Sequence, residues 1–373
     1  MSDASVKKVL HLIDTTGPGG AETVFVNLLT ELEQGALKSV VVLRGNGWVA
    51  DQVRRLGIEP YIIDSKGSFN FKYIKRLREL IVSQKIDLIH AHLLGSNVYG
   101  AILSLITRTP MISTFHGAVD VASKERFLRA KFAIIGWGSS VIVCVSDRLK
   151  AELARRSPLP ARKLQLIYNG VDPGRFLISV PPTLRNELGI PPNAIVVVSI
   201  GNIRPAKGYE YLVASALELA VSDPEFHFIV VGHQRKELFS KLQHQMASAS
   251  RPPNIHWLGY REDVVGLLKQ ADIFLLPSVS EGFSISTVEA MMAGVPVVAT
   301  RSGGPEEIIS DSTLGCLIPP ANSKAITEAL LKLKDRAVRK AVTEQARTAA
   351  NSRFGLAGML ASYSQLYQRL IKS

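Results

Sequence analysis

The stretch "DIFLLPSVSEGFSISTVEAMMAGVPVVAT", residues 272–300, contains the pattern that decides the fold. Short apolar runs, "IFLLPS" and "PVVAT", lie toward its two ends and are typical of strands buried on both faces of a parallel sheet. The residues between them read as a turn followed by a helix, and this order predicts an α/β sheet. Two carboxylates, Glu281 in the turn and Glu289 in the helix, follow the first strand, where such sheets bind ligands.

The same alternation extends outward in both directions. Strand-like runs such as "VLHLIDT", "DLIHAHL", "AIVVVSIGN" and "FHFIVVG" alternate with helical segments such as "AETVFVNLLTELEQ". The rhythm breaks at residues 172–193, where prolines, glycines and weak periodicity predict a linker. We therefore expect two Rossmann-like, doubly wound α/β domains, residues 1–178 and 179–354, facing one interdomain cleft.

Composition is that of an ordinary globular protein, with 46% hydrophobic and 20% charged residues among 373. Cys144 and Cys316 lie in apolar stretches, which favours reduced thiols in a cytosolic protein over a disulfide framework. The longest nearly apolar run, residues 132–145, is interrupted by Gly and Ser and is too short to span a bilayer. The amino-terminal stretch lacks a small-residue cleavage pattern. We expect a cytoplasmic protein.

The net charge of +12 is unevenly distributed. Residues 1–178 hold 24 Lys and Arg against 15 Asp and Glu, whereas the remainder holds 20 against 17. No RNA- or DNA-binding motif accompanies this excess, so we expect no nucleic-acid partner. Two interpretations stay open: solubility alone, or attraction to an anionic acceptor or the inner face of the cell membrane. The second interpretation rests on two segments in which basic and apolar residues are mixed, "FKYIKRLREL" and "SKERFLRAKFAIIGWG". Their basic residues include Lys72, Lys75, Arg76, Lys124, Arg126, Arg129 and Lys131.

Polar motifs in the first half follow strand-like runs. In "GPGGAE", Gly19 and Gly20 would let a phosphate approach the backbone at a helix start, although a plain tight turn is the alternative. His116 ends "MISTFHG" and is a candidate contact for a substrate hydroxyl. In "IHAHL", we expect only one of His90 and His92 to face any given side, and we favour His92 for the acceptor side of the cleft.

The second half offers cations at the equivalent position. "GNIRPAKG" places Arg204 and Lys207 on a loop that leads into a helix, where a diphosphate could bind, the alternative being a solvated loop. No Asp-x-Asp pair occurs anywhere in the chain, so the usual divalent-metal anchor of nucleotide-sugar enzymes is absent from the sequence. We therefore expect no metal, with protein cations stabilising a leaving diphosphate.

These motifs, together with "TFHG", "IYNGVD" and above all "PSVSEGFSISTVEAMMAGVPVVATRSGGPEEII", resemble glycosyltransferase family four, the large retaining family of GT-B architecture. The resemblance implies that Glu281 contacts the donor sugar beside the reacting carbon and that Glu289 binds the ribose. It implies that residues 355–373 form a helix returning to the first domain. The family often has Arg where this chain has Asn202. The resemblance also implies that the backbone N–H groups of Phe283, Ser284 and Ile285 contact the sugar and the phosphate of the donor. The backbone around Gly259 and Tyr260 would contact the nucleotide base.

The expected reaction is transfer of a sugar from a nucleoside-diphosphate-sugar to an acceptor hydroxyl, with retention and without cofactor or metal. We expect Glu281 and His116 to be catalytic. The acceptor would be a glycan or a lipid-linked glycan of cell-envelope or exopolysaccharide assembly, and the sequence distinguishes neither UDP, GDP nor ADP as the donor nucleotide. Two alternatives remain: a nucleotide-sugar 2-epimerase of related fold, and a non-catalytic nucleotide-sugar-binding protein.

Overall fold

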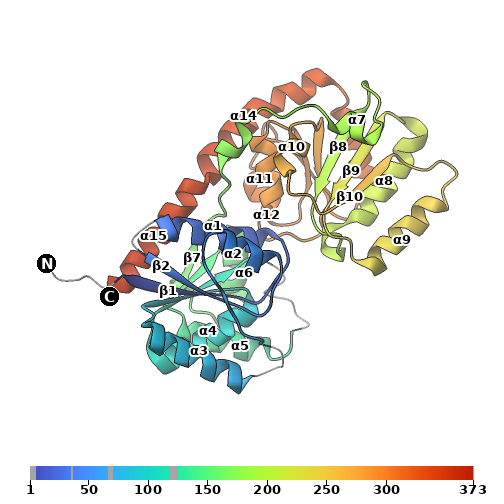
Figure 1. Ribbon diagram of the computed structural model, residues 1–373. Coiled ribbons are helices and arrows are strands. Elements are labelled where there is room, and N and C mark those ends of the chain that lie inside the picture. The colour runs from blue at the N-terminus through green and yellow to red at the C-terminus, as the bar shows by residue number, and fades with distance from the viewer. Residues whose placement is uncertain (1–5, 35–36, 66–69, 118–124, 373) are drawn as a thin grey trace. The chain divides into compact units, whose positions relative to one another are not determined.

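The computed structural model describes residues 6–34, 37–65, 70–117 and 125–372 (Figure 1). The chain divides into two compact units: unit 1 comprises residues 1–170 and 357–373, and unit 2 comprises residues 171–356. Both are built on a parallel sheet, and every strand-like run quoted above forms a strand. The predicted pair of doubly wound α/β domains is thereby confirmed.

Unit 1 contains a seven-stranded sheet in the order β3-β2-β1-β4-β5-β6-β7. β1 pairs in parallel with both β2 and β4, so strand order reverses beside it, as in doubly wound sheets. All residues of β4 and β5 are buried, as expected for strands covered on both faces. The strands are β1 (Lys7–Ile13), β2 (Leu37–Leu43), β3 (Tyr61–Ile62), β4 (Leu88–His92), β5 (Met111–Phe115), β6 (Val141–Cys144) and β7 (Leu164–Leu166).

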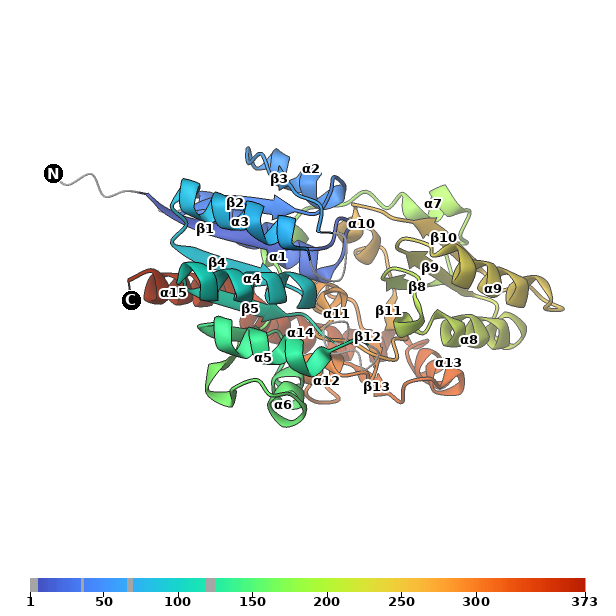
Figure 2. The same cartoon turned by 90° about the horizontal axis from the view of Figure 1, so that it is seen from below.

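Helices cover both faces of this sheet. α3, α4 and α5 lie side by side over one face, as Figure 2 shows. The carboxyl-terminal helix α15 packs in unit 1 through Tyr363 and Tyr367, which contact the His90 ring on β4. The helices of unit 1 are α1 (Gly20–Gln34), α2 (Trp48–Arg55), α3 (Phe71–Gln84), α4 (Leu94–Thr107), α5 (Leu128–Gly138), α6 (Asp147–Arg156) and α15 (Leu356–Lys372). None of the described helices is long and apolar enough to cross a membrane.

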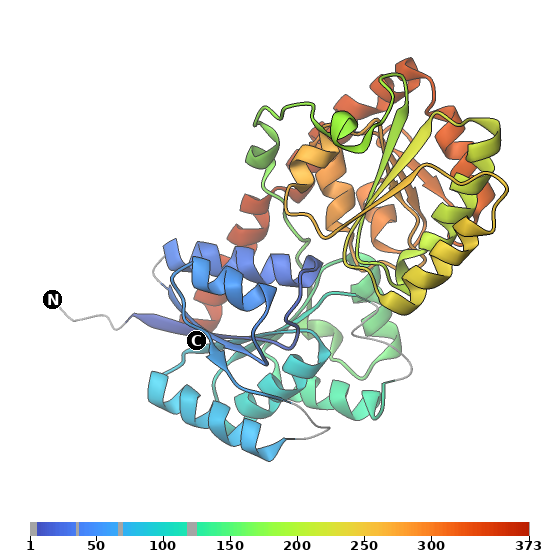
Figure 3. The same cartoon turned by 45° about the vertical axis from the view of Figure 1, so that its right-hand side comes forward.

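Unit 2 contains a six-stranded parallel sheet in the order β10-β9-β8-β11-β12-β13, with helices on both faces (Figure 3). The strands are β8 (Ile195–Ile200), β9 (Phe226–Val231), β10 (Ile255–Gly259), β11 (Ile273–Leu276), β12 (Val297–Thr300) and β13 (Cys316–Ile318). The helices are α7 (Leu184–Leu188), α8 (Tyr209–Ser222), α9 (Lys236–Ala247), α10 (Val264–Leu268), α11 (Ile285–Met292), α12 (Gly304–Ile308), α13 (Ser323–Lys332) and α14 (Arg336–Phe354).

The segment read as a linker, residues 172–193, is part of unit 2. The Val171 N–H donates a hydrogen bond to the Phe354 carbonyl (2.9 Å), and Phe176 is buried at the end of a short 3-10 helix. Leu184 is buried at the start of α7. Because these residues pack on unit 2, the division of the chain lies at residue 170, before the expected position at 178.

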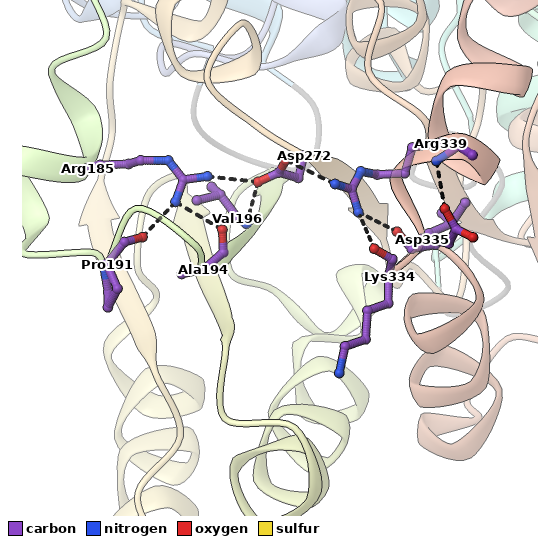
Figure 4. A network of polar contacts seen from close by, with 10 residues as sticks. Arg185, Pro191, Ala194, Val196, Asp272, Lys334, Asp335 and Arg339 are labelled. Carbon is purple, nitrogen blue, oxygen red and sulfur yellow. Dashed lines mark hydrogen bonds and ion pairs between the residues drawn. The ribbon is translucent and has the colours of Figure 1, made fainter.

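A charged network holds this segment to the amino-terminal edge of the unit 2 sheet (Figure 4). Asp272, which precedes β11, accepts hydrogen bonds from the Arg185 guanidinium (2.9 Å) and from the Val196 N–H on β8 (3.0 Å). Arg185 also donates to two backbone carbonyls, and Arg339 on α14 forms an ion pair with Asp272 at 3.6 Å. The network therefore joins α7, the sheet and α14 at the edge opposite the strand ends that carry the motifs.

Candidate active site

The loop after β8 brings its cation against the end of β11. It forms a 3-10 helix, Pro205–Lys207, followed by Gly208 with a φ of +63°. A Cβ at Gly208 would lie 2.1 Å from the Pro277 carbonyl oxygen, so only glycine allows this approach. The Val279 N–H donates to the Ala206 carbonyl (2.9 Å) and fixes the two loops together.

Lys207 and Glu281 form a buried ion pair at this junction. The Lys207 Nζ lies 2.6 Å from Glu281 Oε1, and the Ser278 hydroxyl donates to the same oxygen at 2.5 Å. Only 13% of the Lys207 side chain and 9% of the Glu281 side chain are exposed, so solvent screens the pair weakly. An ammonium has three N–H donors, and a phosphate could accept from those that Glu281 does not use.

Glu289 is buried in α11 and has a partner that the sequence did not indicate. Arg175, in the 3-10 helix Pro173–Phe176, places its Nη1 3.2 Å from Glu289 Oε1. Burial raises the pKa of the Glu289 carboxyl, and the Arg175 guanidinium opposes that shift. No motif marked Arg175, because the pairing joins residues 114 positions apart.

The turn between the two glutamates is rigidly built. Phe283 is 2% exposed and packs edge-on against Phe354, with ring centroids 5.3 Å apart. A Cβ at Gly304 would lie 2.2 Å from the Phe283 carbonyl oxygen. Ser284 has a φ of +85° and a hydroxyl 2.8 Å from that of Thr287. α11 then begins at Ile285, where the first N–H groups of a helix lack intrahelical partners and form its positive end.

The remaining donor-side candidates lie at the carboxyl ends of β8, β9 and β10. The Nε of Arg204 is buried and has no hydrogen-bond partner among the residues described. Asn202 accepts a hydrogen bond from the His233 N–H (3.0 Å), so it supports the loop where the family often has Arg. Gly259 has a φ of +67°, and the Tyr260 ring stacks on His233 with centroids 4.9 Å apart.

The glycine loop of unit 1 carries negative charge. Gly20 begins α1, and a Cβ at Gly19 would lie 2.5 Å from Glu22 Oε2, so the Glu22 carboxylate folds back toward the helix start. Asp14, after β1, accepts a hydrogen bond from the Ser96 N–H in α4, and burial raises the pKa of Asp14. A phosphate at Gly19 and Gly20 would have to compete with these carboxylates.

His92 and His116 are in contact at the ends of β4 and β5. The His92 Nδ1 lies 3.0 Å from the His116 Nε2, and the rings stack with centroids 5.3 Å apart. His92 is fully buried and His116 partly so; burial lowers the pKa of His116 to about 3 and that of His92 well below its usual value. Both imidazoles are therefore neutral at pH 7. His116 is the more accessible of the two, with His92 behind it.

The expectation that only one of His90 and His92 faces a given side was wrong. Residues two apart on a strand project from the same face, and the two rings lie 4.2 Å apart. His90 is instead bound at both nitrogens, by the Tyr367 hydroxyl (2.6 Å) and the Thr114 hydroxyl (2.8 Å). It thus fixes α15 to the unit 1 sheet.

Within the described part of the chain, one group of side chains has metal-ligand spacing: His11, His90 and His92, with potential ligand atoms within 4.8 Å of one another. All three are buried, and the two nitrogens of His90 already have hydroxyl partners. We interpret the group as core packing.

Comparison with known proteins places both units in one family. A family model described as "Glycosyltransferase Family 4" matches residues 18–175, and one described as "Glycosyl transferases group 1" matches residues 181–349. The matched ranges together cover most of the chain and meet near the boundary between the two units.

Three individual relatives share between 22% and 27% of their aligned residues with this chain. An uncharacterized glycosyltransferase of Methanocaldococcus jannaschii is 27% identical over 254 residues, which are 65% of this chain and 64% of the relative. The Escherichia coli UDP-Gal:alpha-D-GlcNAc-diphosphoundecaprenol alpha-1,3-galactosyltransferase is 22% identical over 308 residues, 80% of this chain and 79% of the relative. The crystal structure of Anabaena HepE with UDP and glucose has a TM-score of 0.88 at 22% identity, covering 97% of this chain and 100% of HepE.

Proposed function

Because this chain belongs to glycosyltransferase family four, the group 1 glycosyl transferases, we propose that it transfers a sugar from a nucleoside-diphosphate-sugar to an acceptor hydroxyl with retention at the anomeric carbon. The family and the relatives set the epimerase alternative aside. The observation that carries the proposal is the buried pair of Lys207 and Glu281 beside the amino-terminal end of α11. It combines a cation for the diphosphate with a carboxylate for the sugar.

The donor would lie along the carboxyl edge of the unit 2 sheet. Glu289 accepts hydrogen bonds from the ribose hydroxyls, and the N–H groups at the start of α11 face the diphosphate. Lys207 stabilises the charge that develops on the leaving phosphate as the anomeric C–O bond breaks. Tyr260 offers a π-face near the base. Arg204, whose buried Nε has no hydrogen-bond partner in the described part of the chain, adds a second cation in the place of the family's arginine.

The acceptor hydroxyl attacks the anomeric carbon from the face that the diphosphate leaves. The new C–O bond forms as the old one breaks, and the departing phosphate oxygen takes the acceptor's proton, so no side chain has to act as a nucleophile. His116, neutral at pH 7, can orient a hydroxyl. Replacing it by Asn should reduce turnover without changing nucleotide affinity; loss of both would contradict this role.

We propose a glycan or lipid-linked acceptor and peripheral contact with an anionic membrane. The support is the basic excess of residues 1–178 and the lipid-linked acceptor in the name of the Escherichia coli relative. A soluble acceptor is the alternative.

The test is a panel of UDP-, GDP- and ADP-sugars, scored by calorimetry for binding and by nucleotide release for slow hydrolysis. We expect binding of the sugars of one nucleotide only. The rate of hydrolysis of that nucleotide-sugar should be the same in excess EDTA as with Mg²⁺. Activity that disappears in EDTA and returns with Mg²⁺ or Mn²⁺ would contradict metal independence. Binding without hydrolysis or transfer would favour the non-catalytic alternative.

A further inference from the structure

The outer surface of α3, α4 and α5 combines protruding apolar side chains with positive charge. These three helices lie side by side over one face of the unit 1 sheet (Figures 1 and 2). Half or more of each of six large apolar side chains on or next to them is exposed to solvent, from 51% to 76%. They are Phe71, Val82, Leu105, Ile106, Phe127 and Trp137.

The charge on the same helices is strongly one-sided. Residues 71–85, 94–108 and 125–139 hold nine Lys and Arg against Glu79 and Glu125, a net +7 of the chain's +12. The helices of the opposite face differ: α1 has three Glu and no Lys or Arg, α2 has two Arg and one Asp, and α15 has one Arg, one Lys and no Asp or Glu, so their charges sum to zero. No large apolar residue of α1 or α2 is among the exposed ones in the described part of the chain. The bias therefore belongs to one face of unit 1.

We infer that the surface of α3, α4 and α5 is a docking face for an anionic phospholipid membrane. Aromatic rings such as Phe71 and Trp137 favour the boundary between headgroups and acyl chains, while Lys and Arg around them are attracted to the lipid charge. The inference rests on the proposed function in one respect, that docking would bring the enzyme to a lipid-linked acceptor. The contact itself needs neither donor nor acceptor.

A hollow lies beside the first two turns of α3. It has a volume of about 430 Å³ and is lined by Lys72, Lys75 and Arg76, with Asp64 and Glu79 also on its wall. Lys75 forms a weak ion pair with Glu79 at 4.0 Å, a pair so exposed that a phosphate could replace its carboxylate. Cations next to an exposed aromatic ring suit a phosphodiester better than an uncharged ligand.

The charge also argues against a second copy of this chain as the occupant. A symmetric dimer through this face would place two strongly positive surfaces opposite each other, which is unfavourable. A soluble polyanion such as RNA would satisfy the charge but would leave Val82, Leu105 and Ile106 without a partner. A membrane satisfies both the charge and the apolar side chains.

The experiment is co-sedimentation of the full chain with vesicles of phosphatidylcholine alone or mixed with phosphatidylglycerol. We expect binding to the mixed vesicles only, weakened by salt. The variant Lys72→Ser, Arg76→Ser, Arg129→Ser should bind on the order of a hundredfold more weakly, since each charge near an anionic surface accounts for roughly fivefold. Arg336→Ser, Lys340→Ser and Arg347→Ser together, three exposed changes on α14 of unit 2, form the matched control and should bind like wild type.

Fluorescence tests the apolar part. Trp emission should shift to shorter wavelength on anionic vesicles, and the shift should be lost in Trp137→Phe while binding persists. Equal binding to neutral vesicles, no binding to either kind, or RNA binding unaffected by Phe71→Ser and Trp137→Ser would overturn the inference. Nucleotide affinity of each variant, measured in parallel, separates failure of docking from failure of the proposed donor site.

Discussion

The carboxyl edges of the two sheets share a fold but differ in charge. In unit 2, Lys207 and Arg204 lie where β8 ends, beside the positive end of α11. In unit 1, the corresponding turn after β1 holds the carboxylates of Asp14 and Glu22 with Arg44 beside Asp14, and the neighbouring strands end in neutral histidines. A phosphate is favoured more at the first edge than at the second, whereas neutral histidines suit hydroxyl groups. Parallel sheets supply the position of a site, and the side chains at strand ends decide its chemistry.

We expect the largest effect from removing the Glu281 carboxylate at the carboxyl edge of the unit 2 sheet. Glu281→Gln keeps the shape but removes the charge that Lys207 and Ser278 surround. We expect turnover to fall by about 10²–10³, the range for losing one charge-stabilising group, with a smaller effect on nucleotide affinity. Steady-state kinetics and calorimetry give the two values. Ser278→Ala, which removes only a hydrogen bond, is the control, and a loss of nucleotide affinity with turnover unchanged would show that Glu281 serves binding alone.

Lys207→Ala should abolish the preference of unit 2 for phosphate. Nucleoside-diphosphate affinity should fall by about 1.5–3 kcal/mol, as for a lost charge-assisted contact, whereas the weak affinity for the nucleoside alone should not change. Titration calorimetry with both ligands measures the difference. Arg204→Ala is the comparison variant and should have a smaller effect. If Lys207→Ala bound the diphosphate as well as wild type, the cationic edge would have no phosphate role.

Acid should destabilise unit 1 more than unit 2, because burial also lowers the pKa of His227 and His256 in unit 2 but these two are only partly buried. Burial lowers the pKa of His11 to about 3, and the pKa values of His90 and His92 are also depressed, so these residues stay neutral when folded but take up protons near pH 6.5 when unfolded. Between pH 6.5 and about 3 the unfolded state binds more protons, and stability decreases as pH falls, by on the order of 1 kcal/mol per histidine per pH unit.

Hydrogen exchange followed by mass spectrometry at pH 7 and pH 5 resolves the two units. Peptides of β1, β4 and α15 should lose protection at pH 5, while those of β8 and β11 keep it. His11→Leu, which removes one buried titrating ring, should reduce the sensitivity. Uniform loss of protection across both units would mean that the histidines do not control acid stability.

Arg175 gives the smallest expected effect. Arg175→Met removes the guanidinium that opposes the burial-driven rise in the pKa of Glu289. Nucleotide affinity should fall by roughly 0.5–1.5 kcal/mol, the worth of one hydrogen bond, and should begin to fall at a higher pH than in wild type. Calorimetry across a pH series measures this, with Arg175→Lys as the charge-preserving control. A parallel pH profile in both variants would leave Arg175 with a purely structural role.

The local pattern was sufficient to predict the strands and which strand ends carry the candidate donor-site motifs. The apolar runs predicted where the strands lie along the chain, because a parallel strand buried on both faces must be apolar throughout. "GNIRPAKG" and "EGFSISTVE" follow β8 and β11, and sheet topology makes these strands neighbours, so Lys207 and Glu281 had to lie close together. The interpretation of residues 172–193 as a linker missed Phe176 and Leu184, since two scattered apolar residues give no periodicity.

Two parallel α/β sheets, and the strand ends that carry the polar motifs, were predictable from the amino-acid sequence, because both follow from short-range periodicity. Tertiary structure alone decided that Arg175 pairs with Glu289, that Glu22 folds over Gly19 and that Tyr367 binds His90 across 277 positions. It also decided that Phe71, Leu105 and Trp137 remain exposed rather than packing on the sheet. Burial and long-range charge pairing depend on how the helices pack against the sheets. That packing brings together residues far apart in the chain, so local sequence patterns do not predict it.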